Sequence, residues 1–400
     1  MKIDLLSPDS FAGGQPHGQF DWLRANQPVA WHDEPGGKGF WAVTRHADVR
    51  AVDRDFQTYS SEPTIMINDP LSDAGSFGPY KMMLMMDPPE HTGFRKLIRS
   101  EFTEPAARLR GERIAELARQ IVDAVIDRGK CDFVSEVAGE MPSFVIAELM
   151  GVPLEDGREL YKLTEIIHTA PEAQPPGAAS QAVMKMFEYG GRVIAEKRAR
   201  PGEDLASKLL ACEVDGRRLE DMEFLLFFLL LVDAGGDTTR NLLSGGLLAL
   251  MENPEQYAWL MADFEARLPM AREELLRWTS PVIYMRRTAR RDAELGGARI
   301  RAGDKVVMYF GAANRDPEVF DDPDRFDVRR DPNPHVGFGG PGPHFCLGAH
   351  LARREITVMF RELFRRVPDI RAVGEPDRLQ SNFINGIKHL QAEWTPAARA

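Results

Sequence analysis

The chain has 400 residues, a formal net charge of −11 and a hydrophobic fraction of 43%, which is enough for a sizeable core. Because phosphate binding needs a concentrated basic surface, the acidic balance disfavours nucleic acid as a partner. The longest apolar run, residues 224–232, is too short to cross a bilayer, so we expect no membrane anchor.

No linker, low-complexity tract or charge block divides the sequence, and we therefore expect residues 1–400 to form a single domain. The first residues do not have the pattern of a secretory signal. The cysteines Cys131, Cys212 and Cys346 are odd in number and widely spaced, which suits a reducing compartment. We expect a cytoplasmic protein in which Cys131 and Cys212 are structural.

The first third of the chain combines a short strand signal with a helix that carries two cations. Residues 40–43 are β-leaning and predict a strand. His91 and Arg95 lie four apart in a helical segment and therefore share one face. Five methionines precede His91, and their flexible thioethers suit either an adaptable pocket wall or plain core. These are Met66, Met82, Met83, Met85 and Met86.

Two helices are predicted in the next segment. Helical periodicity is clear over residues 104–126, where Gly129 gives a stop, and over 183–198, before Pro201. Residues 169–177 lie between them and predict a mobile lid loop.

The longest helix is expected over residues 220–251 and ends before Pro254. It is apolar nearly all round at 224–232, which is typical of a central buried helix. Asp233 follows this run, and an aspartate among leucines is unfavourable unless it has a partner. Two interpretations stay open: an internal partner such as an arginine, or a role in orienting a hydroxyl or amine on a substrate.

The same helix contains a run that interrupts its apolar pattern. Gly235 and Gly236 each cost about 1 kcal/mol relative to alanine inside a helix. A local opening would explain both, with the Thr238 hydroxyl directed to the carbonyl of Ala234. Asp237 and Thr238 then provide an acid and an alcohol that can relay protons. The alternative is a simple interruption between two helices.

Further charge patterns follow. Glu274 and Arg277 are spaced for one helix face, and residues 298–307 carry a second strand signal.

Two groups of basic residues suit either a solvated helix face or a docking surface for an acidic electron donor such as a ferredoxin. They are Arg95, Lys96 and Arg99, and then Arg353, Arg354, Arg361, Arg365 and Arg366.

A glycine-rich loop over residues 337–348 presents Cys346 immediately before a predicted helix at 349–360. The positive end of the helix dipole favours a thiolate. No second cysteine lies nearby to form a disulfide or a zinc site. A lone thiolate of this kind suits iron whose other ligands come from a cofactor, which is haem-thiolate chemistry. The alternative is a small buried hydrophobe.

At these residues the sequence resembles the cytochrome P-450 monooxygenases, whose cysteine loop reads Phe-Gly-x-Gly-x-His/Arg-x-Cys-x-Gly. One extra residue separates the phenylalanine from the cysteine here. Residues 234–238 match the family's Ala/Gly-Gly-x-Asp/Glu-Thr motif at every position, and the motifs in order span residues 87–348. The matching loop positions are Phe338, Gly342, His344, Cys346 and Gly348.

The resemblance implies a mainly α fold with a small β region and a haem (heme b) cofactor bound through Cys346 as the axial ligand. It also implies that the Glu274–Arg277 pair is buried and joins Arg325 to brace the cysteine loop. By the same resemblance, residues 280–284 and 382–386 line the substrate pocket. The residues that hold the propionates would be His91, Arg95, Arg287 and His344.

The implied reaction is insertion of one atom of dioxygen (O2) into an unactivated C–H bond of a mostly apolar terpenoid, steroid or fatty compound. Asp237 and Thr238 would be catalytic. Electrons would come from NAD(P)H through a separate reductase and an acidic ferredoxin, since no flavin or nicotinamide domain follows the haem region. Two alternatives stay open: a peroxide-driven oxidant, and a haem sensor or carrier without chemistry.

Overall fold

Strand-forming segments near the N-terminus pair with strands from the second half of the chain. The computed structural model describes residues 2–69, 77, 79–214 and 216–399. A five-stranded sheet has the order β1-β2-β10-β7-β3, with β10 parallel to β2 and antiparallel to β7. Its strands are β1 Val29–His32, β2 Phe40–Val43, β3 Tyr59–Ser60, β7 Tyr284–Ala289 and β10 Lys305–Tyr309.

The strand expected at residues 40–43 is confirmed as β2. Residues 298–307 instead contain parts of two strands, because the chain turns at Gly303, where φ is 89°. The smaller sheets include one in which β12 pairs with both β11 and β4. The remaining strands are β4 Lys130–Asp132, β5 Glu213–Val214, β6 Arg217–Arg218, β8 Ala293–Leu295, β9 Ala298–Ile300, β11 Arg371–Arg378 and β12 Ile387–Glu393.

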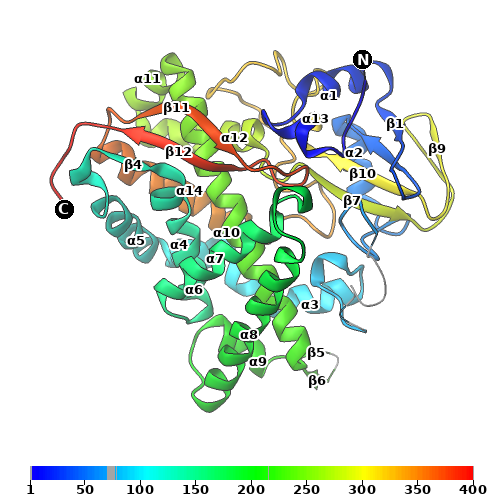
Figure 1. Cartoon of the computed structure of the whole chain (residues 1–400), viewed down its shortest axis with the longest axis horizontal. Helices are drawn as coiled ribbons and strands as arrows, with labels where there is room; N and C mark the ends of the chain where they lie inside the picture. Colours follow the sequence, from blue (N-terminus) through cyan, green and yellow to red (C-terminus); the bar gives the residue numbers. More distant parts are fainter. Residues whose placement is uncertain (1, 70–76, 78, 215, 400) are drawn as a thin grey trace.

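Most of the chain is helical, and the five-stranded sheet lies to one side of the main helical body (Figure 1). The expected mainly α fold with a small β region is confirmed. The helices are α1 His17–Asn26, α2 His46–Arg54, α3 Glu90–Ile98, α4 Glu104–Leu109, α5 Gly111–Asp123, α6 Glu140–Met150, α7 Leu154–His168, α8 Ala178–Ala199, α9 Leu205–Ala211, α10 Asp221–Glu252, α11 Pro254–Ala262, α12 Phe264–Thr279, α13 Phe310–Ala313 and α14 Ala349–Arg366.

The long helix α10 runs through the middle of the molecule (Figure 1). It begins with a capping box formed by Glu220 and Glu223 and ends before Pro254, which starts α11. Its apolar surface packs against α6, α7, α8 and α12. The bounds expected from the sequence agree with the structure to within one residue at each end.

The helix expected over residues 104–126 is two helices, α4 and α5. Only Arg110 separates the two helices, and a β-carbon at Gly111 would overlap the guanidinium of Arg354 on α14. The glycine therefore permits close packing of α5 against α14. α5 ends at Asp123, earlier than expected, and Gly129, with φ 71°, ends the short 3-10 helix Ile126–Arg128 that follows.

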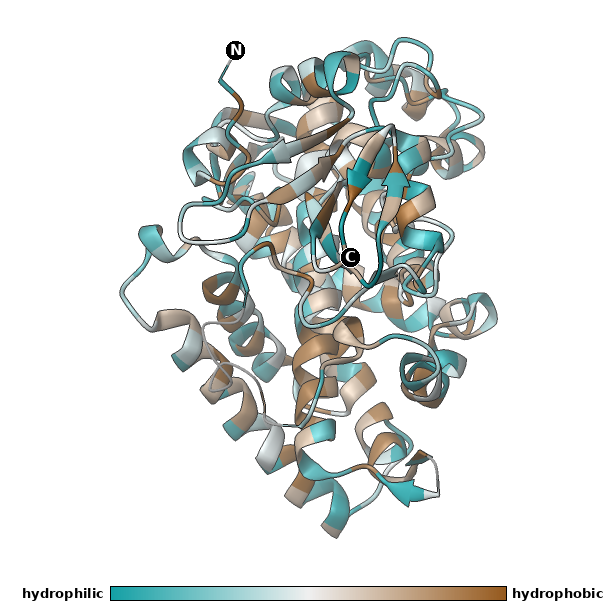
Figure 2. Ribbon diagram, turned by 90° about the vertical axis from the view of Figure 1, so that its right-hand side faces the viewer, coloured by the Kyte–Doolittle hydropathy of each residue, from teal (hydrophilic) through white to brown (hydrophobic). Residues whose placement is uncertain are grey.

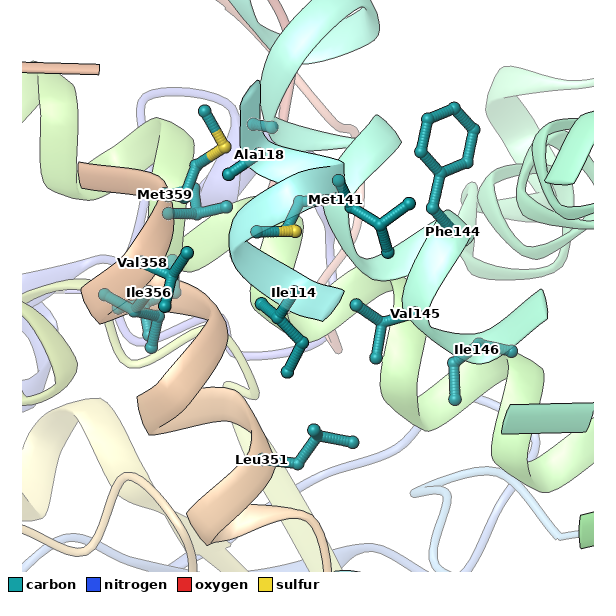
Figure 3. Packing of buried hydrophobic residues seen from close by; sticks show 14 of the residues in the cluster. Ile114, Ala118, Met141, Phe144, Val145, Ile146, Leu351, Ile356, Val358 and Met359 are labelled. Carbon is teal, nitrogen blue, oxygen red and sulfur yellow. The ribbon is translucent and has the colours of Figure 1, made fainter. Parts of the chain in front are cut away.

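Apolar residues are concentrated on the interior helices (Figure 2). In the close view of Figure 3, α5, α6 and α14 meet through buried side chains that include Ile114, Met141, Val145 and Ile356. Each such side chain contributes about 1.5–3 kcal/mol by leaving water. This packing fixes the start of α14, and therefore the cysteine loop that leads into it.

Within the described residues, no single helix is long and apolar enough to cross a membrane. One bent pair, Val134–Met150 and Leu154–His168 at 117°, reaches that length and composition when the two are taken together.

Candidate active site

The cysteine loop folds back on itself immediately before α14. Cys346 donates its backbone N–H to the carbonyl of Phe338 at 2.9 Å, and Gly339 has φ 86°. Asp53, at the end of α2, accepts a hydrogen bond from the Gly340 amide at 2.7 Å. A β-carbon at Gly342 would overlap the backbone of Asp53. The glycines therefore allow the loop to lie directly against α2.

The Cys346 thiol lies at the entrance to α14, as the sequence predicted. Burial raises its pKa, while the backbone amide of Gly348 and the positive charges of Arg95 and Arg353 act to lower it. A metal cation bound to the sulfur removes the thiol proton outright. This environment suits a thiolate ligand that becomes charged when iron binds.

The structure brings together the four residues that were expected to hold the propionates. His91 and Arg95 come from α3, Arg287 from β7 and His344 from the cysteine loop. The rings of His91 and His344 have centroids 4.1 Å apart. Burial and neighbouring positive charges lower the pKa of His91 to about 4 and that of His344 to about 2.

The hydrogen-bonding groups of these residues are only partly satisfied within the described chain. Arg95 donates to the carbonyl of Phe345 at 2.7 Å, and His344 lies 3.0 Å from the carbonyl of Met86. The buried Nδ1 of His91 has no hydrogen-bond partner among the described residues. Arg95 and Arg287 supply the positive charge here, and the unpartnered ring nitrogen of His91 leaves room for a further hydrogen bond. This combination fits an anionic group such as a haem propionate.

Arg287 is held by a residue that the sequence did not indicate. Its Nη2 lies 3.0 Å from Asp53 Oδ1, and both side chains are buried. The same aspartate binds the Gly340 amide, so Asp53 connects Arg287 to the cysteine loop.

On α10, the Thr238 hydroxyl donates to the carbonyl of Ala234 at 2.9 Å, as predicted. Ala234 is exposed, although most of the helix around it is buried. This stretch of α10 is therefore uncovered by side chains.

Asp237, beside Thr238, is fully buried and forms an ion pair with Arg240. Burial raises the pKa of Asp237 to about 7, against the charge of His168, which lowers it. Its second oxygen, Oδ2, is buried without a hydrogen-bond partner among the described residues. Arg240 also lies 3.1 Å from Glu165 on α7, whose side chain is 30% exposed.

The family model for cytochrome P450 matches residues 46–368. The chain belongs to the cytochrome P450 family.

The similarity extends over nearly the whole chain. A steroid C26-monooxygenase of Mycolicibacterium smegmatis is 40% identical over 94% of this chain and 90% of its own. A methyl-branched lipid omega-hydroxylase of Mycobacterium bovis is 40% identical over 94% of this chain and 91% of its own. Among solved structures, the Mycobacterium marinum cytochrome P450 CYP268A2 in complex with pseudoionone has a TM-score of 0.92 and 41% identity, covering 98% of this chain and 99% of that one.

These similarities show that the protein is a P450 monooxygenase, with the P450 fold. Its cofactor is haem, which the family binds through an axial cysteine thiolate. The geometry of the cysteine loop and of the group formed by His91, Arg95, Arg287 and His344 is consistent with that cofactor.

The two glycines of this P450's central helix do not interrupt it. α10 is helical without interruption across Gly235 and Gly236, so the boundary between two helices is absent. A β-carbon at Gly235 would approach Ile146 Cδ1 to 2.8 Å. Gly235 therefore allows α6 to pack closely against α10.

The expected triad beside the P450 cysteine loop contains a different third arginine. Glu274 and Arg277 are fully buried and paired at 2.7 Å, as predicted. Arg330 completes the group, with Nε 3.2 Å from Glu274 Oε2. Arg325 is exposed, and only its carbonyl takes part, accepting from Arg277 at 3.1 Å. The expectation for Arg325 was wrong, because the turn after Phe326 carries Arg330 back to Glu274.

The two segments expected to line the pocket lie side by side. Ile283 donates to the carbonyl of Phe383, and Asn385 to that of Pro281, both at 2.8 Å. The five methionines that precede His91 differ in burial. Met83 and Met86 are core residues, whereas the other three are only partly buried.

Asp233 has an internal partner, which was one of the two interpretations left open, and that partner is a histidine. His168 Nε2, at the end of α7, lies 2.7 Å from Asp233 Oδ1. The segment predicted as a lid begins at the next residue. Its Ala170 donates to the carbonyl of Gln380 at 2.9 Å.

Most of the basic residues on α14 are paired with acids. Arg353 lies 2.7 Å from Glu273, and Arg361 lies 2.6 Å from Glu265. Arg365 and Arg366 both contact Glu362. The unpaired basic surface near the cysteine loop is therefore smaller than the sequence indicated.

Proposed function

We propose that this P450 hydroxylates an unactivated C–H bond of a mostly apolar terpenoid, steroid or fatty compound, using one atom of O2. The names of two relatives specify a steroid and a methyl-branched lipid, and solved neighbours contain pseudoionone and testosterone. The proposal rests mainly on one arrangement of residues. Thr238 donates its hydroxyl to the carbonyl of the exposed Ala234 and lies beside the buried acid Asp237.

In this proposal, residues 1–400 are one haem-thiolate domain. Cys346 holds the iron, and His91, Arg95, Arg287 and His344 hold the propionates. Bound haem supplies the activation of O2 that insertion into a C–H bond requires. The protein supplies the cavity, the orientation of the substrate and the protons.

Proton delivery is the role assigned to Asp237 and Thr238. With a pKa of about 7, Asp237 can hold a proton near neutral pH. The hydroxyl of Thr238 can accept one hydrogen bond while it donates another. Arg240 and the partly exposed Glu165 connect Asp237 to solvent. Relay by positioned groups of this kind contributes about 10²–10⁴-fold to rate.

Electrons would come from NAD(P)H through a reductase and an acidic ferredoxin. The exposed residues Lys96 and Arg99 lie on α3 and directly after it. Arg95 on the same helix contacts the backbone of Phe345, which is itself 40% exposed beside Cys346. This basic surface next to the thiolate suits an acidic donor, with association that weakens as salt rises.

The test is turnover of Thr238→Ala with a ferredoxin, its reductase and NADH. We expect NADH consumption to continue while hydroxylated product falls about tenfold or more, because general acid–base relay is lost. Ser244→Ala is the matched control, since Ser244 also donates to the carbonyl four residues earlier on α10. It should leave the yield of product unchanged.

The two alternative functions give different results. A peroxide-driven oxidant would form product with peroxide alone and gain nothing from the reductase. A sensor or carrier would consume no electrons with any ligand, and Thr238→Ala would change nothing.

A further inference from the structure

The end of α7, the centre of α10 and the loop at residues 382–386 meet at one polar pair. Asp233 Oδ1 accepts a hydrogen bond from His168 Nε2 at 2.7 Å. The ring of Phe383 stacks on the imidazole, with centroids 5.7 Å apart and planes inclined by 26°. His168 is therefore held on two sides and fixes the orientation of the carboxylate.

The other oxygen of this carboxylate is available. Oδ2 of Asp233 receives no hydrogen bond within the part of the chain that the structure describes, and the side chain is 25% exposed. The next residue, Ala234, is exposed, and Thr238 lies one turn beyond Ala234. Asp233 thus offers an acceptor at the edge of the uncovered stretch of α10.

The ring that stacks on His168 belongs to an apolar cluster. Phe383 packs with Ile384 and Tyr284 in one hydrophobic cluster, and Val282 and Met66 pack against it. In such an environment a hydrogen bond to a charged acceptor strongly favours a ligand that carries a donor. A ligand of the same shape without a donor would leave the carboxylate oxygen unpaired.

The charge of the Asp233–His168 pair determines which kind of hydrogen-bond donor a ligand should carry. Burial acts to lower the pKa of His168, but the carboxylates of Asp233 and Asp237 outweigh it and raise the pKa to about 9. His168 is therefore an imidazolium at neutral pH, and it balances the charge of Asp233. A neutral hydroxyl suits this balanced pair better than an ammonium group does.

We propose that Asp233, positioned by His168, determines specificity by accepting a hydrogen bond from a hydroxyl group on the apolar substrate. The inference rests on the proposed function, because it concerns the same substrate. The α-carbons of Asp233 and Thr238 are about 7.5 Å apart along the helix axis. The substrate is therefore an apolar alcohol that is oxidised at a carbon away from its existing hydroxyl.

The test uses the haem-loaded enzyme and three pairs of compounds: farnesol, lauryl alcohol and testosterone, each with its methyl ether. Each ether keeps the apolar body and lacks the donor. The dissociation constant is read from the change in the haem absorption spectrum as the ligand displaces water. In the wild type we expect at least one alcohol to bind about tenfold more tightly than its ether.

Two variants test whether the preference for the alcohol over its ether depends on Asp233 and His168. Asp233→Leu should bring the alcohol and its ether to within about twofold of each other, because the acceptor is gone. His168→Gln keeps a donor toward Oδ1 but removes the charge and the stacked ring, so it should reduce the preference and broaden the set of hydroxylated positions. Asp221→Asn, at the exposed start of the same helix, should retain the full preference.

Equal affinity for the alcohol and the ether in all three pairs would overturn the inference, as would a preference that survives in Asp233→Leu. Those results leave the proposed monooxygenase function intact, because binding of the apolar body is still observed. If none of the six compounds changed the spectrum, the proposed apolar substrate class itself would fail, and the inference with it.

Discussion

Asp237 and Arg240 form an ion pair on one face of α10, and their side chains are 1% and 0% exposed. Removing one partner of such a pair leaves an uncompensated buried charge. Arg240 also contacts Glu165 on α7. The acid assigned to proton delivery is therefore tied to the helix that ends at His168.

The pH dependence of hydroxylation should follow the Asp237 carboxyl. Burial raises its pKa to about 7, so the protonated form that can donate is lost as pH rises above that value. We expect product formation at saturating substrate to fall between pH 7 and 9 in the wild type. Asp237→Asn should lower the rate by about 10²-fold and remove this dependence. An unchanged profile in the variant would show that another group supplies the proton.

The stability contributed by His168 should be lost at alkaline pH. Its pKa in the folded protein is about 9, above the ordinary 6.5, because Asp233 and Asp237 outweigh the effect of burial. The contribution is therefore fully present below about pH 6.5 and disappears as pH rises through 9. The free energy of unfolding of the wild type, measured relative to His168→Gln with urea, should fall by about 3 kcal/mol from pH 6 to pH 10. If the difference in free energy of unfolding between the wild type and His168→Gln stayed constant from pH 6 to pH 10, the raised pKa of His168 would be contradicted.

The two arginines beside the Glu274–Arg277 pair should behave differently. Arg330→Ala removes a contact to the fully buried Glu274 carboxylate and should lower the free energy of unfolding by about 3 kcal/mol. Arg325→Ala removes an exposed side chain and should change it by less than about 0.5 kcal/mol. Chemical denaturation of the two variants shows which arginine stabilises the Glu274–Arg277 pair. Equal losses, or a larger loss for Arg325→Ala, would restore the expectation drawn from the sequence.

The two glycines of α10 provide another matched comparison. Gly235→Ala places a methyl group 2.8 Å from Ile146 and should destabilise the protein by about 1–3 kcal/mol. Gly236→Ala meets Tyr161 only at 3.9 Å and should be neutral or stabilising by up to about 1 kcal/mol. Ile146→Ala should offset part of the loss in Gly235→Ala. A greater loss in Gly236→Ala would mean that the second glycine is needed for another reason.

Local features of the sequence were sufficient to predict α10 and the cysteine loop. The apolar surface at residues 224–232 and the stop at Pro254 placed the helix to within one residue. Glycine spacing and a lone cysteine before a helical run placed Cys346 at a helix entrance. The hydrogen bond from Thr238 to the Ala234 carbonyl was expected together with a local opening at the two glycines, and it forms within the continuous helix.

Long-range partners could not be predicted in the same way. Asp53 contacts Arg287 and Gly340 across 234 and 287 positions of the chain, and no local pattern marks that relationship. His168 and Asp233 are 65 positions apart. Arg325 and Arg330 lie in one irregular segment, and only the turn after Phe326 decides which of them reaches Glu274.

Ligation of the haem iron by Cys346 can be read from the absorption spectrum of the haem-loaded protein, reduced under carbon monoxide. With the Cys346 thiolate bound to iron, the wild type should show the strongly red-shifted Soret band of thiolate ligation, and Cys346→His should lack it while Cys212→Ser retains it. A wild type without that band, or a Cys346→His variant that keeps it, would contradict the account.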